Sequence, residues 1–449
     1  MSMPQRDYLK DYDDAAPADK YPLVDSWIKT DERLPFFEQL RKERPVLVTP
    51  ECTLVALFPD VRDMLSMPKI FTVDLYKPKM SVTAPDDGYL MAHDDNALHY
   101  REKSLMQGML NRDDLPWVRK LIEDSAKNIL EQANGSIEVI NDYCRMVPVT
   151  LVQDYFGLDG VDPKELIEWS YWNQYDAFNN QPFDMLSDEE SQHITDEHNK
   201  VSDKLGAYIA SLIIRKLVII KATSGIRAML SYPKRILLSL LGKAMKSQQD
   251  DIVTRMLRTA FAKGVDFPLV RLGTNAGGLL IGAIETTSQA TSQVIEYFIK
   301  HPELLKKAKQ AASFEDRAEF DALVWEALRF VPIRPDIFRK ASTDYTIAKG
   351  APHETEIKKG TIVRLLTQSA MFDSYAFDKP EKFNPNRNWY HNFNFGFGSH
   401  ECLGKYVGMV MIPEMIRQVI LKAELSDDEA IDYKNGPFPE KYNLNWRSQ

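Results

Sequence analysis

Residues 395–404 read Phe-Gly-Phe-Gly-Ser-His-Glu-Cys-Leu-Gly. Cys402 is one of only three cysteines in the 449-residue chain, and an apolar, helix-permissive run begins directly after Gly404. The glycines around this cysteine indicate a tight backbone turn and a close approach to a flat or bulky group. A cysteine held just before a helix is well placed to be a thiolate metal ligand. The alternative is a buried, inert cysteine, because free cysteine is among the most buried residue types.

The spacing of the segment favours the metal ligand. The pattern Phe-x-x-Gly-x-His-x-Cys-x-Gly resembles, position for position, the heme-thiolate loop of the cytochrome P450 family. The resemblance implies a heme b cofactor (iron protoporphyrin IX), with the thiolate of Cys402 as the proximal iron ligand. It also implies that Phe395, His400 and Gly404 contribute to the cofactor site, and that the chain has the cytochrome P450 fold.

Composition and cysteine usage limit the classes of protein to which the chain can belong. The three cysteines, at positions 52, 144 and 402, are far apart and odd in number. This argues against a disulfide framework and against a cysteine-rich zinc or iron–sulfur site. A reducing, cytoplasmic setting fits best. The net charge of −9 gives no reason to expect a nucleic-acid partner.

Hydrophobic periodicity predicts a mainly α fold with small β-sheets. No linker-like tract interrupts the chain, so we expect one domain over residues 1–449, with a charged, flexible N-terminus over 1–20 and no signal peptide or membrane anchor. Alternation over 45–57 predicts a small hairpin. Strands are otherwise expected only over 345–366. Helices are predicted over 99–110, 116–133, 136–156, 163–175 and 188–222.

Residues 206–249 differ from the rest of the chain. They contain eight Lys or Arg residues, no acid and three aliphatic clusters, but no apolar run of the roughly 20 residues that a membrane span needs. A basic amphipathic stretch of this kind predicts peripheral membrane contact or docking of an acidic partner. A solvated basic face over an ordinary helix is an equally good interpretation. By resemblance to the family, the segment belongs to a substrate lid, and 223–247 looks like an insertion.

A second motif lies inside a long helical run, where residues 282–287 read Gly-Ala-Ile-Glu-Thr-Thr. Glycine and β-branched residues are unfavourable in mid-helix, and the Thr286 hydroxyl can compete for the Gly282 carbonyl and open the helix locally. The motif resembles the oxygen-binding turn of the same family, with Ala283 in place of the second glycine. The resemblance implies that Glu285 and Thr286 deliver protons to the distal oxygen.

Glu326 and Arg329 lie three residues apart, so the two charges share one face of a helix. A surface ion pair of this kind would contribute only about 0–1 kcal/mol. The apolar flanking residues favour a buried pair instead. The pair resembles the Glu-x-x-Arg helix of the family, and Arg387 fits the partner that completes its structural network.

Several basic residues fall at positions where the family binds the heme propionates. Arg339 has forked donors that suit a carboxylate. His99 and Lys103 lie on one helical face and resemble a His-x-x-x-Arg pair, although lysine offers a point charge instead of a fork. His400 would add a further donor. Taken singly, each of these residues fits a solvated surface position; together they favour the cofactor site.

The resemblance implies a monooxygenase that uses O2 and two electrons to oxidise an apolar small molecule. The chain has no flavin or nicotinamide fingerprint and no cysteine cluster, so electrons must come from a separate ferredoxin, flavodoxin-type or reductase protein. The predicted pocket walls are the loop 77–91, the turn 331–337 that ends at Ile337, and the helix face near Gly278 and Ile281. Their aliphatic and aromatic content suggests a mostly apolar ligand.

Two other functions remain open at the level of the sequence. A peroxide-using or isomerising heme-thiolate enzyme would need no redox partner, but such enzymes often lose the acid–threonine pair that is retained here. A heme-binding sensor or carrier would bind ligands without catalysis. A Cys–His hydrolase fits poorly, because His400 adjoins Cys402 on a turn and no oriented base is evident.

Overall fold

The computed structural model describes residues 6–240 and 250–447, and the side chains of residues 222–240 fall outside the description. Helices dominate, and the strands are short, so the predicted mainly α fold is confirmed. The α-helices are α1 (Tyr8–Asp14), α2 (Lys20–Lys29), α3 (Arg33–Glu43), α4 (Phe58–Leu65), α5 (Ala97–Met109), α6 (Leu115–Gln132), α7 (Met146–Leu151), α8 (Pro163–Asn179), α9 (Asp188–Leu240), α10 (Ile252–Ala260), α11 (Leu269–Ala283), α12 (Glu285–Lys300), α13 (Pro302–Ala312), α14 (Ala318–Phe330), α15 (Thr367–Met371) and α16 (Lys405–Ile420).

The strands form three small sheets. One sheet has the order β1-β2-β8-β5-β3, in which β2 and β8 are parallel and the other neighbours antiparallel. A second sheet has the order β4-β10-β9, and β6 pairs with β7. The strands are β1 (Val46–Val48), β2 (Thr53–Val55), β3 (Phe71–Thr72), β4 (Ser136–Glu138), β5 (Ile337–Ala341), β6 (Tyr345–Ile347), β7 (Thr355–Ile357), β8 (Ile362–Leu365), β9 (Ser426–Asp427) and β10 (Asn443–Asn445).

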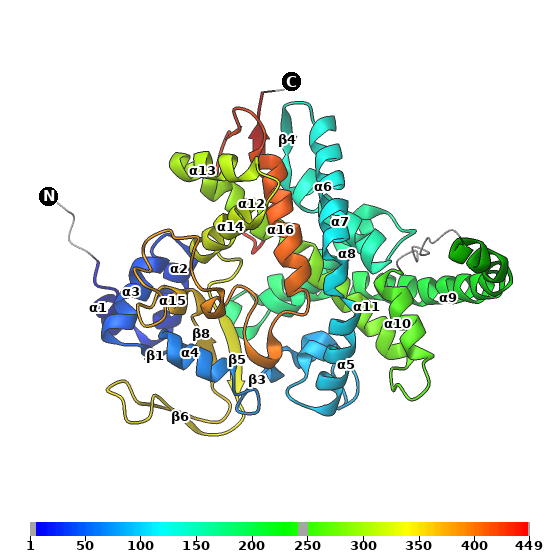
Figure 1. Cartoon of the computed structure of the whole chain (residues 1–449). Coiled ribbons are helices and arrows are strands. Elements are labelled where there is room, and N and C mark those ends of the chain that lie inside the picture. The colour runs from blue at the N-terminus through cyan, green and yellow to red at the C-terminus, as the bar shows by residue number, and fades with distance from the viewer. Residues whose placement is uncertain (1–5, 241–249, 448–449) are drawn as a thin grey trace.

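Helix α16 lies at the centre of the helical part of the molecule. It packs against α6 on one side and against α12 and α14 on the other (Figure 1). Its residues from Met411 to Ile420 are buried nearly all round, as expected for a central helix of a large protein. Because α16 begins directly after the Cys402 loop, its packing fixes the position of that loop.

The N-terminal helices α1 to α4 lie beside the five-stranded sheet (Figure 1). The prediction of a flexible segment over residues 1–20 is wrong for residues 6–20. Asp7 caps α1, and Tyr8, Leu9 and Tyr12 are buried in an aromatic cluster with Trp27. Burial of three large side chains outweighs the charged character of the segment.

Two further expectations about the elements need correction. The helix predicted over 136–156 begins later, because Ser136–Glu138 forms β4 and pairs with β10 near the C-terminus. Strands also occur outside the expected ranges, among them β5, which pairs with β8 from Ile337 opposite Leu365 to Lys340 opposite Ile362. The predicted hairpin over 45–57 is confirmed as β1 and β2.

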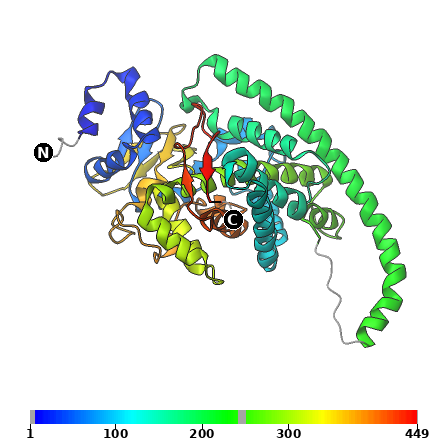
Figure 2. The same ribbon diagram turned by 90° about the horizontal axis from the view of Figure 1, so that it is seen from above.

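Helix α9 runs along the outside of α8 and then extends past the rest of the molecule (Figure 2). Within the basic stretch 206–249, Arg215 pairs with Asp159 at 2.5 Å and Lys216 with Asp251 at 2.8 Å. Most of the other basic residues of 206–249, and the predicted insertion over 223–247, lie outside the described side chains. Among the described residues, no helix is long and apolar enough to cross a membrane.

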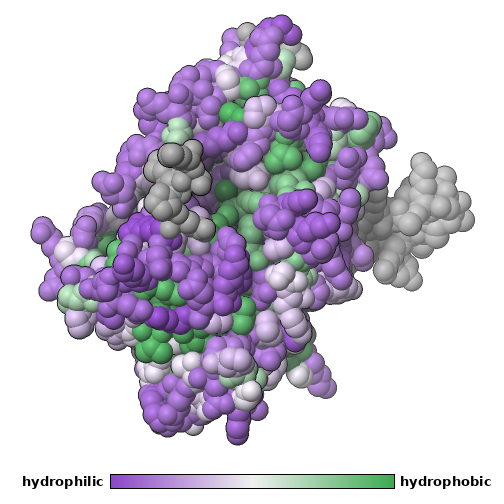
Figure 3. Space-filling view, turned by 90° about the vertical axis from the view of Figure 1, so that its left-hand side faces the viewer, coloured by the Kyte–Doolittle hydropathy of each residue, from purple (hydrophilic) through white to green (hydrophobic). Residues whose placement is uncertain are grey.

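On the face that carries the N-terminal helices, apolar residues gather in a depression bordered by hydrophilic ones (Figure 3). Beneath the surface, buried apolar side chains of α6, α11, α12, α14 and α16 form a continuous core. This core supports α11, α12 and the Cys402 loop, which carry the candidate site.

Candidate active site

The loop around Cys402 is a tight turn, as its glycines predict. The Cys402 N–H donates to the Phe395 carbonyl oxygen at 2.8 Å. Gly396 and Gly398 both have φ of 71°, a left-handed conformation that side chains rarely adopt. A Cβ atom at Gly398 would also lie 2.8 Å from the Leu65 carbonyl oxygen. Glycine is therefore required at this position, and Gly404 then caps the start of α16.

Cys402 differs from the other two cysteines in its surroundings. Cys52 and Cys144 are buried, whereas Cys402 is accessible. Burial among protein atoms nevertheless raises the pKa of the Cys402 thiol, while the Gly404 amide and the Lys103 ammonium act in the opposite direction. A metal ion at the sulfur would remove the thiol proton and reverse the effect of burial.

Several buried polar atoms next to this loop have no hydrogen-bond partner in the described part of the chain. They include His400 Nε2, Asp94 Oδ2 and Ser399 Oγ. Arg339 is 6% exposed, and the Phe338 carbonyl is the acceptor that its guanidinium contacts. Burial lowers the pKa of Arg339, and it lowers the pKa of His400 to about 4. His400 Nε2 also lies 3.4 Å from Asp94 Oδ1, so a carboxylate adjoins this histidine. Buried polar groups normally have hydrogen-bond partners, so the remaining polar atoms beside the loop fit a polar group that the chain does not supply.

His99 and Lys103 lie on the inner face of α5, as their spacing predicts, but they contact the loop backbone. His99 Nε2 is 3.1 Å from the Ser399 carbonyl oxygen. Lys103 Nζ donates to the same oxygen and to the Glu401 carbonyl oxygen at 2.8 Å. The two side chains therefore tie α5 to the Cys402 loop, whereas Arg339 donates to the Phe338 carbonyl oxygen at 2.8 Å and His400 adjoins Asp94.

The long helical run breaks where the second motif predicts. α11 ends at Ala283 and α12 begins at Glu285, and Thr286 Oγ1 donates to the Gly282 carbonyl oxygen at 2.8 Å. Thr286 is half-buried and lines a cavity of about 220 Å³. The hydroxyl is thus held at the wall of the cavity by the opened turn.

Glu285 lies next to Thr286 in sequence but does not line this cavity. It is 1% exposed, and its Oε2 is 3.0 Å from Arg145 Nη2. Arg145 also pairs with Glu440 at 3.2 Å. Burial raises the pKa of Glu285 to about 7, against the opposing effect of Arg145. The expectation that both residues face the reaction site is therefore corrected: Thr286 faces the cavity, whereas Glu285 is turned towards Arg145.

The ion pair predicted on α14 is present and buried. Arg329 Nη2 is 2.7 Å from Glu326 Oε1, and Arg387 Nε is 3.1 Å from the same oxygen. Arg329 also donates to three backbone carbonyls, those of Met371, Pro380 and Lys382. The set fastens the segment before the Cys402 loop to α14.

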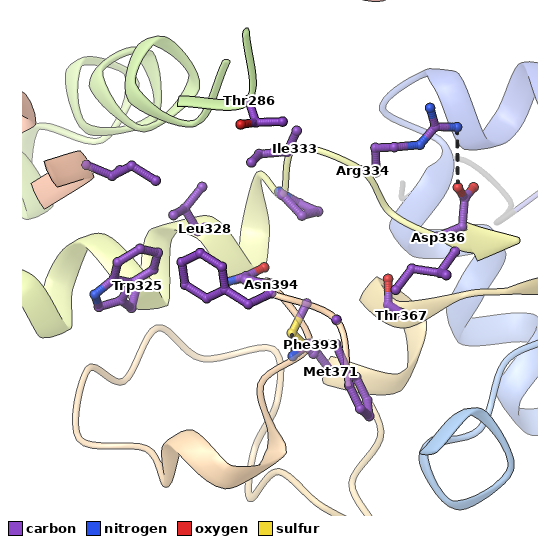
Figure 4. Close-up of a pocket in the computed structure, with 15 residues that line it drawn as sticks. Thr286, Trp325, Leu328, Ile333, Arg334, Asp336, Thr367, Met371, Phe393 and Asn394 are labelled. Carbon is purple, nitrogen blue, oxygen red and sulfur yellow. Dashed lines mark hydrogen bonds and ion pairs between the residues drawn. The ribbon is translucent and has the colours of Figure 1, made fainter. Parts of the chain in front are cut away.

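The cavity lies between the α11–α12 break, the Cys402 loop and the turn before β5. Ile337 lines it together with Phe395 and Gly396. Thr286, Trp325 and Arg334 lie around the same cavity (Figure 4). Gly278 does not line it, because the ring of Tyr89 covers that glycine so closely that a Cβ atom would approach the ring to 2.1 Å. Ile281 is also not among the lining residues. Of the three predicted wall residues, the structure therefore places only Ile337 at this cavity.

Sequence reasoning missed two kinds of residue. Arg145 and Glu440, the partners of Glu285, come from distant segments, and no spacing could have indicated them. Arg334 and Asp336 also line the cavity, in a turn that we expected to be an apolar wall. The signal for these two was available, since they are the only charged residues between Val331 and Ile337.

Comparison with known proteins agrees with this geometry. The sequence profile of the cytochrome P450 family matches residues 77–436. The chain is 24% identical to pulcherriminic acid synthase of Bacillus subtilis (strain 168) over 433 residues, which covers 90% of this chain and 92% of the relative. The fold is shared with P450BioI in complex with an acyl carrier protein ligated to hexadec-9Z-enoic acid (TM-score 0.72, 20% identity, 94% of this chain and 100% of that chain). It is also shared with CYP109E1 from Bacillus megaterium in complex with testosterone (TM-score 0.71, 18% identity, 92% and 97%).

The chain belongs to the cytochrome P450 family. It is an oxidoreductase of the monooxygenase class and has heme as its cofactor. The residues present fit such a group: an accessible sulfur follows a glycine turn, and unsatisfied buried donors lie beside it. A heme held here supplies dioxygen activation, and electron donation from a thiolate favours O–O cleavage.

Proposed function

We propose that this single-domain chain is a heme b-thiolate monooxygenase that transfers one oxygen atom of O2 to an apolar small molecule. What supports the proposal above all is that Thr286 and the loop of the accessible Cys402 border one cavity. Most of the cavity wall is apolar, with Leu328, Ile333 and Ile337 among its residues. Such a wall favours a hydrocarbon body over a polar one.

In this proposal each residue at the site has a separate role. Cys402 holds the iron, and Arg339 and His400, both next to the Cys402 loop, hold the cofactor carboxylates. The Thr286 hydroxyl donates its hydrogen bond to the Gly282 carbonyl oxygen, so its oxygen faces the cavity as a hydrogen-bond acceptor. Glu285 lies behind the opened turn, paired with Arg145, and burial raises its pKa to about 7.

Electrons come from a separate ferredoxin, flavodoxin-type or reductase protein, because no flavin or nicotinamide fingerprint occurs in the sequence. A cytoplasmic location, with peripheral membrane contact through residues 206–249, belongs to the same proposal. Exposed Ile214 and Val218, one turn apart on α9, support the contact. Co-sedimentation with anionic vesicles that weakens as salt rises tests it, and equal binding to neutral vesicles would contradict it.

The ferrous–CO spectrum tests the ligand assignment. We expect Cys402→Ser to lose the long-wavelength Soret band that a thiolate ligand gives. Cys52→Ala is the control, because Cys52 is buried elsewhere, and it should keep the band. An unchanged band in Cys402→Ser would exclude Cys402 as the ligand.

Oxygen use tests the reaction class. With an electron-donating reductase system, we expect product formation to require O2, and peroxide alone to support little turnover. Efficient turnover with peroxide and no reductase would instead favour a peroxide-using enzyme. Ligand-induced spectral shifts with no oxygen uptake would favour a sensor or carrier.

A further inference from the structure

One end of the cavity carries charge. Arg334 and Asp336 lie at the opposite end of the pocket from Trp325, and Thr286 lies between (Figure 4). Arg334 Nη1 donates to Asn179 Oδ1 at 2.7 Å and to the Phe178 carbonyl oxygen at 3.0 Å, both at the end of α8. Its Nη2 is 3.8 Å from Asp336 Oδ1, too far for a hydrogen bond. Arg334 lines the cavity and its side chain is 37% exposed, so the protein covers this charge only in part.

Asp336 is already engaged by another arginine. Its Oδ2 accepts from Arg364 Nε at 2.7 Å, and Arg364 reaches Asp25 with a second nitrogen at 2.9 Å. The other carboxylate oxygen, Asp336 Oδ1, is buried and has no hydrogen-bond partner in the described part of the chain. Asp336 thus serves as a buried counter-ion of Arg364 and leaves Arg334 incompletely neutralised.

Further charged groups surround Arg334 and Asp336. Arg33 adds a third guanidinium near Asp336, and its buried Nε has no hydrogen-bond partner in the described residues. Lys29 lies 2.6 Å from Asp25. Asp184 is another carboxyl near Arg334; burial raises its pKa, and the Arg334 guanidinium acts in the opposite direction. Of the described residues that line the cavity, Arg334 is the only cation, and its ion pair with Asp336 is long at 3.8 Å.

We propose that the substrate is an amphipathic carboxylic acid, whose carboxylate pairs with Arg334 while its apolar body extends along Ile333 and Ile337 towards Thr286. A guanidinium matches a carboxylate with two parallel hydrogen bonds, and the partly enclosed site strengthens the pair. This inference rests on the proposed monooxygenase function, and it names the class of substrate for the same cavity.

The test compares acids with their neutral analogues on the heme-loaded protein. The probes are decanoic acid and 4-phenylbutanoic acid, each beside its methyl ester, so that only the charge of the polar end changes greatly. Dissociation constants come from the ligand-induced Soret shift and, independently, from isothermal titration calorimetry. We expect at least one of the two acids to bind about tenfold more tightly than its ester, the typical effect of one hydrogen-bonded charged group. Added salt should weaken only the acid.

Variants locate this preference. Arg334→Gln should raise the dissociation constant of the acid to that of the ester and leave the constant of the ester unchanged. Arg334→Lys should retain part of the preference for the acid over the ester. Lys29→Gln is the matched control, because it removes a positive charge from the same cluster at a side chain that is 61% exposed and does not line the cavity. It should leave both constants unchanged.

Three results would overturn the inference. They are equal binding of acid and ester, no binding of either acid, and an equal loss of acid and ester binding in Arg334→Gln. The last would assign Arg334 to holding the end of α8. The ferrous–CO spectrum separates these failures from failure of the proposed function. A thiolate-type spectrum without acid preference overturns only the substrate class, whereas a wild-type protein without that spectrum overturns the proposed function.

Discussion

Glu285 and Thr286 are adjacent residues with different surroundings. Thr286 donates to the Gly282 carbonyl oxygen at the cavity wall, whereas Glu285 is enclosed and paired with Arg145. Successive residues of a helix point about 100° apart, so one turn presents the first to the protein interior and the second to the cavity. Glu285, the acid of the motif, therefore differs from an exposed glutamate in its pKa, which burial raises.

The raised pKa of Glu285 predicts a pH-dependent stability. Its folded value of about 7 lies above the usual 4.5, so the folded state favours the protonated form. The resulting stabilisation is present below pH 4.5 and is lost as pH rises through 7. Between pH 5 and 8 this effect changes the free energy of unfolding by at most about 3 kcal/mol. Glu285→Gln should remove this part of the pH dependence. Urea unfolding of both proteins at the two pH values measures it.

The charged groups that face Glu285 also influence its pKa and therefore this measurement. Arg145 favours its ionised form, Glu440 disfavours it, and the Tyr171 hydroxyl is hydrogen-bonded to Glu440. Glu303→Gln is the control, because Glu303 is exposed at the start of α13, and it should follow the wild type. If Glu285→Gln follows the wild type as well, the carboxyl is already ionised at pH 5.

At the scale of elements, α14 and the segment before the Cys402 loop are held together by charge. Glu326 accepts from both Arg329 and Arg387, and the Arg329 side chain is 1% exposed. Buried ion pairs add little net stability, but removal of one partner leaves a buried charge unpaired. The network therefore holds α14 and the segment before the Cys402 loop together next to the site.

We expect Arg329→Met to lower the free energy of unfolding by about 3–5 kcal/mol and to weaken heme retention, because Glu326 loses its closest partner in the interior. Arg387→Met should cost less, since several of its acceptors are exposed. Urea unfolding and the heme-to-protein absorbance ratio measure the effect. Lys300→Met, which removes a lysine that is 52% exposed from its pair with Glu296, is the control and should lower the free energy of unfolding by about 0–1 kcal/mol. A similar decrease in the free energy of unfolding for Arg329→Met and Lys300→Met would contradict the proposed role of the Glu326 network.

At the scale of the whole molecule, elements near both termini pack against or pair with other parts of the chain. α1 packs on α2 and α3 through Tyr8, Leu9 and Tyr12. β10 pairs with β4, and Glu440 beside it reaches Arg145. The C-terminal segment is thus part of the framework that holds Glu285, whereas α1 completes the packing of α2 and α3.

Removal of residues 1–15 should therefore lower the melting temperature, because it uncovers apolar surface on Trp27 and Phe36. Each large buried side chain contributes about 1.5–3 kcal/mol, so the loss of three should be readily measured by thermal denaturation. Removal of residues 1–5 alone is the control and should have little effect. Equal melting temperatures for the two truncations would support the flexible terminus that composition predicted.

The sequence by itself determined the features that depend on residues within one turn or one helix. The glycines around Cys402 fix a turn, Thr286 reaches Gly282 four residues earlier, and Glu326 meets Arg329 three residues later. Mainly α composition and the hairpin over 45–57 follow from periodicity in the same way. Local spacing carries this information because helix and turn geometry are fixed.

Only the tertiary structure decided which distant segments meet. It joined Glu285 to Arg145 and Glu440, turned residues 136–138 into a strand by supplying β10 as a partner, and placed the Arg334 guanidinium at the end of the cavity. It also packed the charged N-terminal segment as α1. Burial, pairing and counter-ion balance depend on neighbours far away in sequence. A side chain's charge is therefore read from the sequence, but whether that charge is satisfied is read only from the fold.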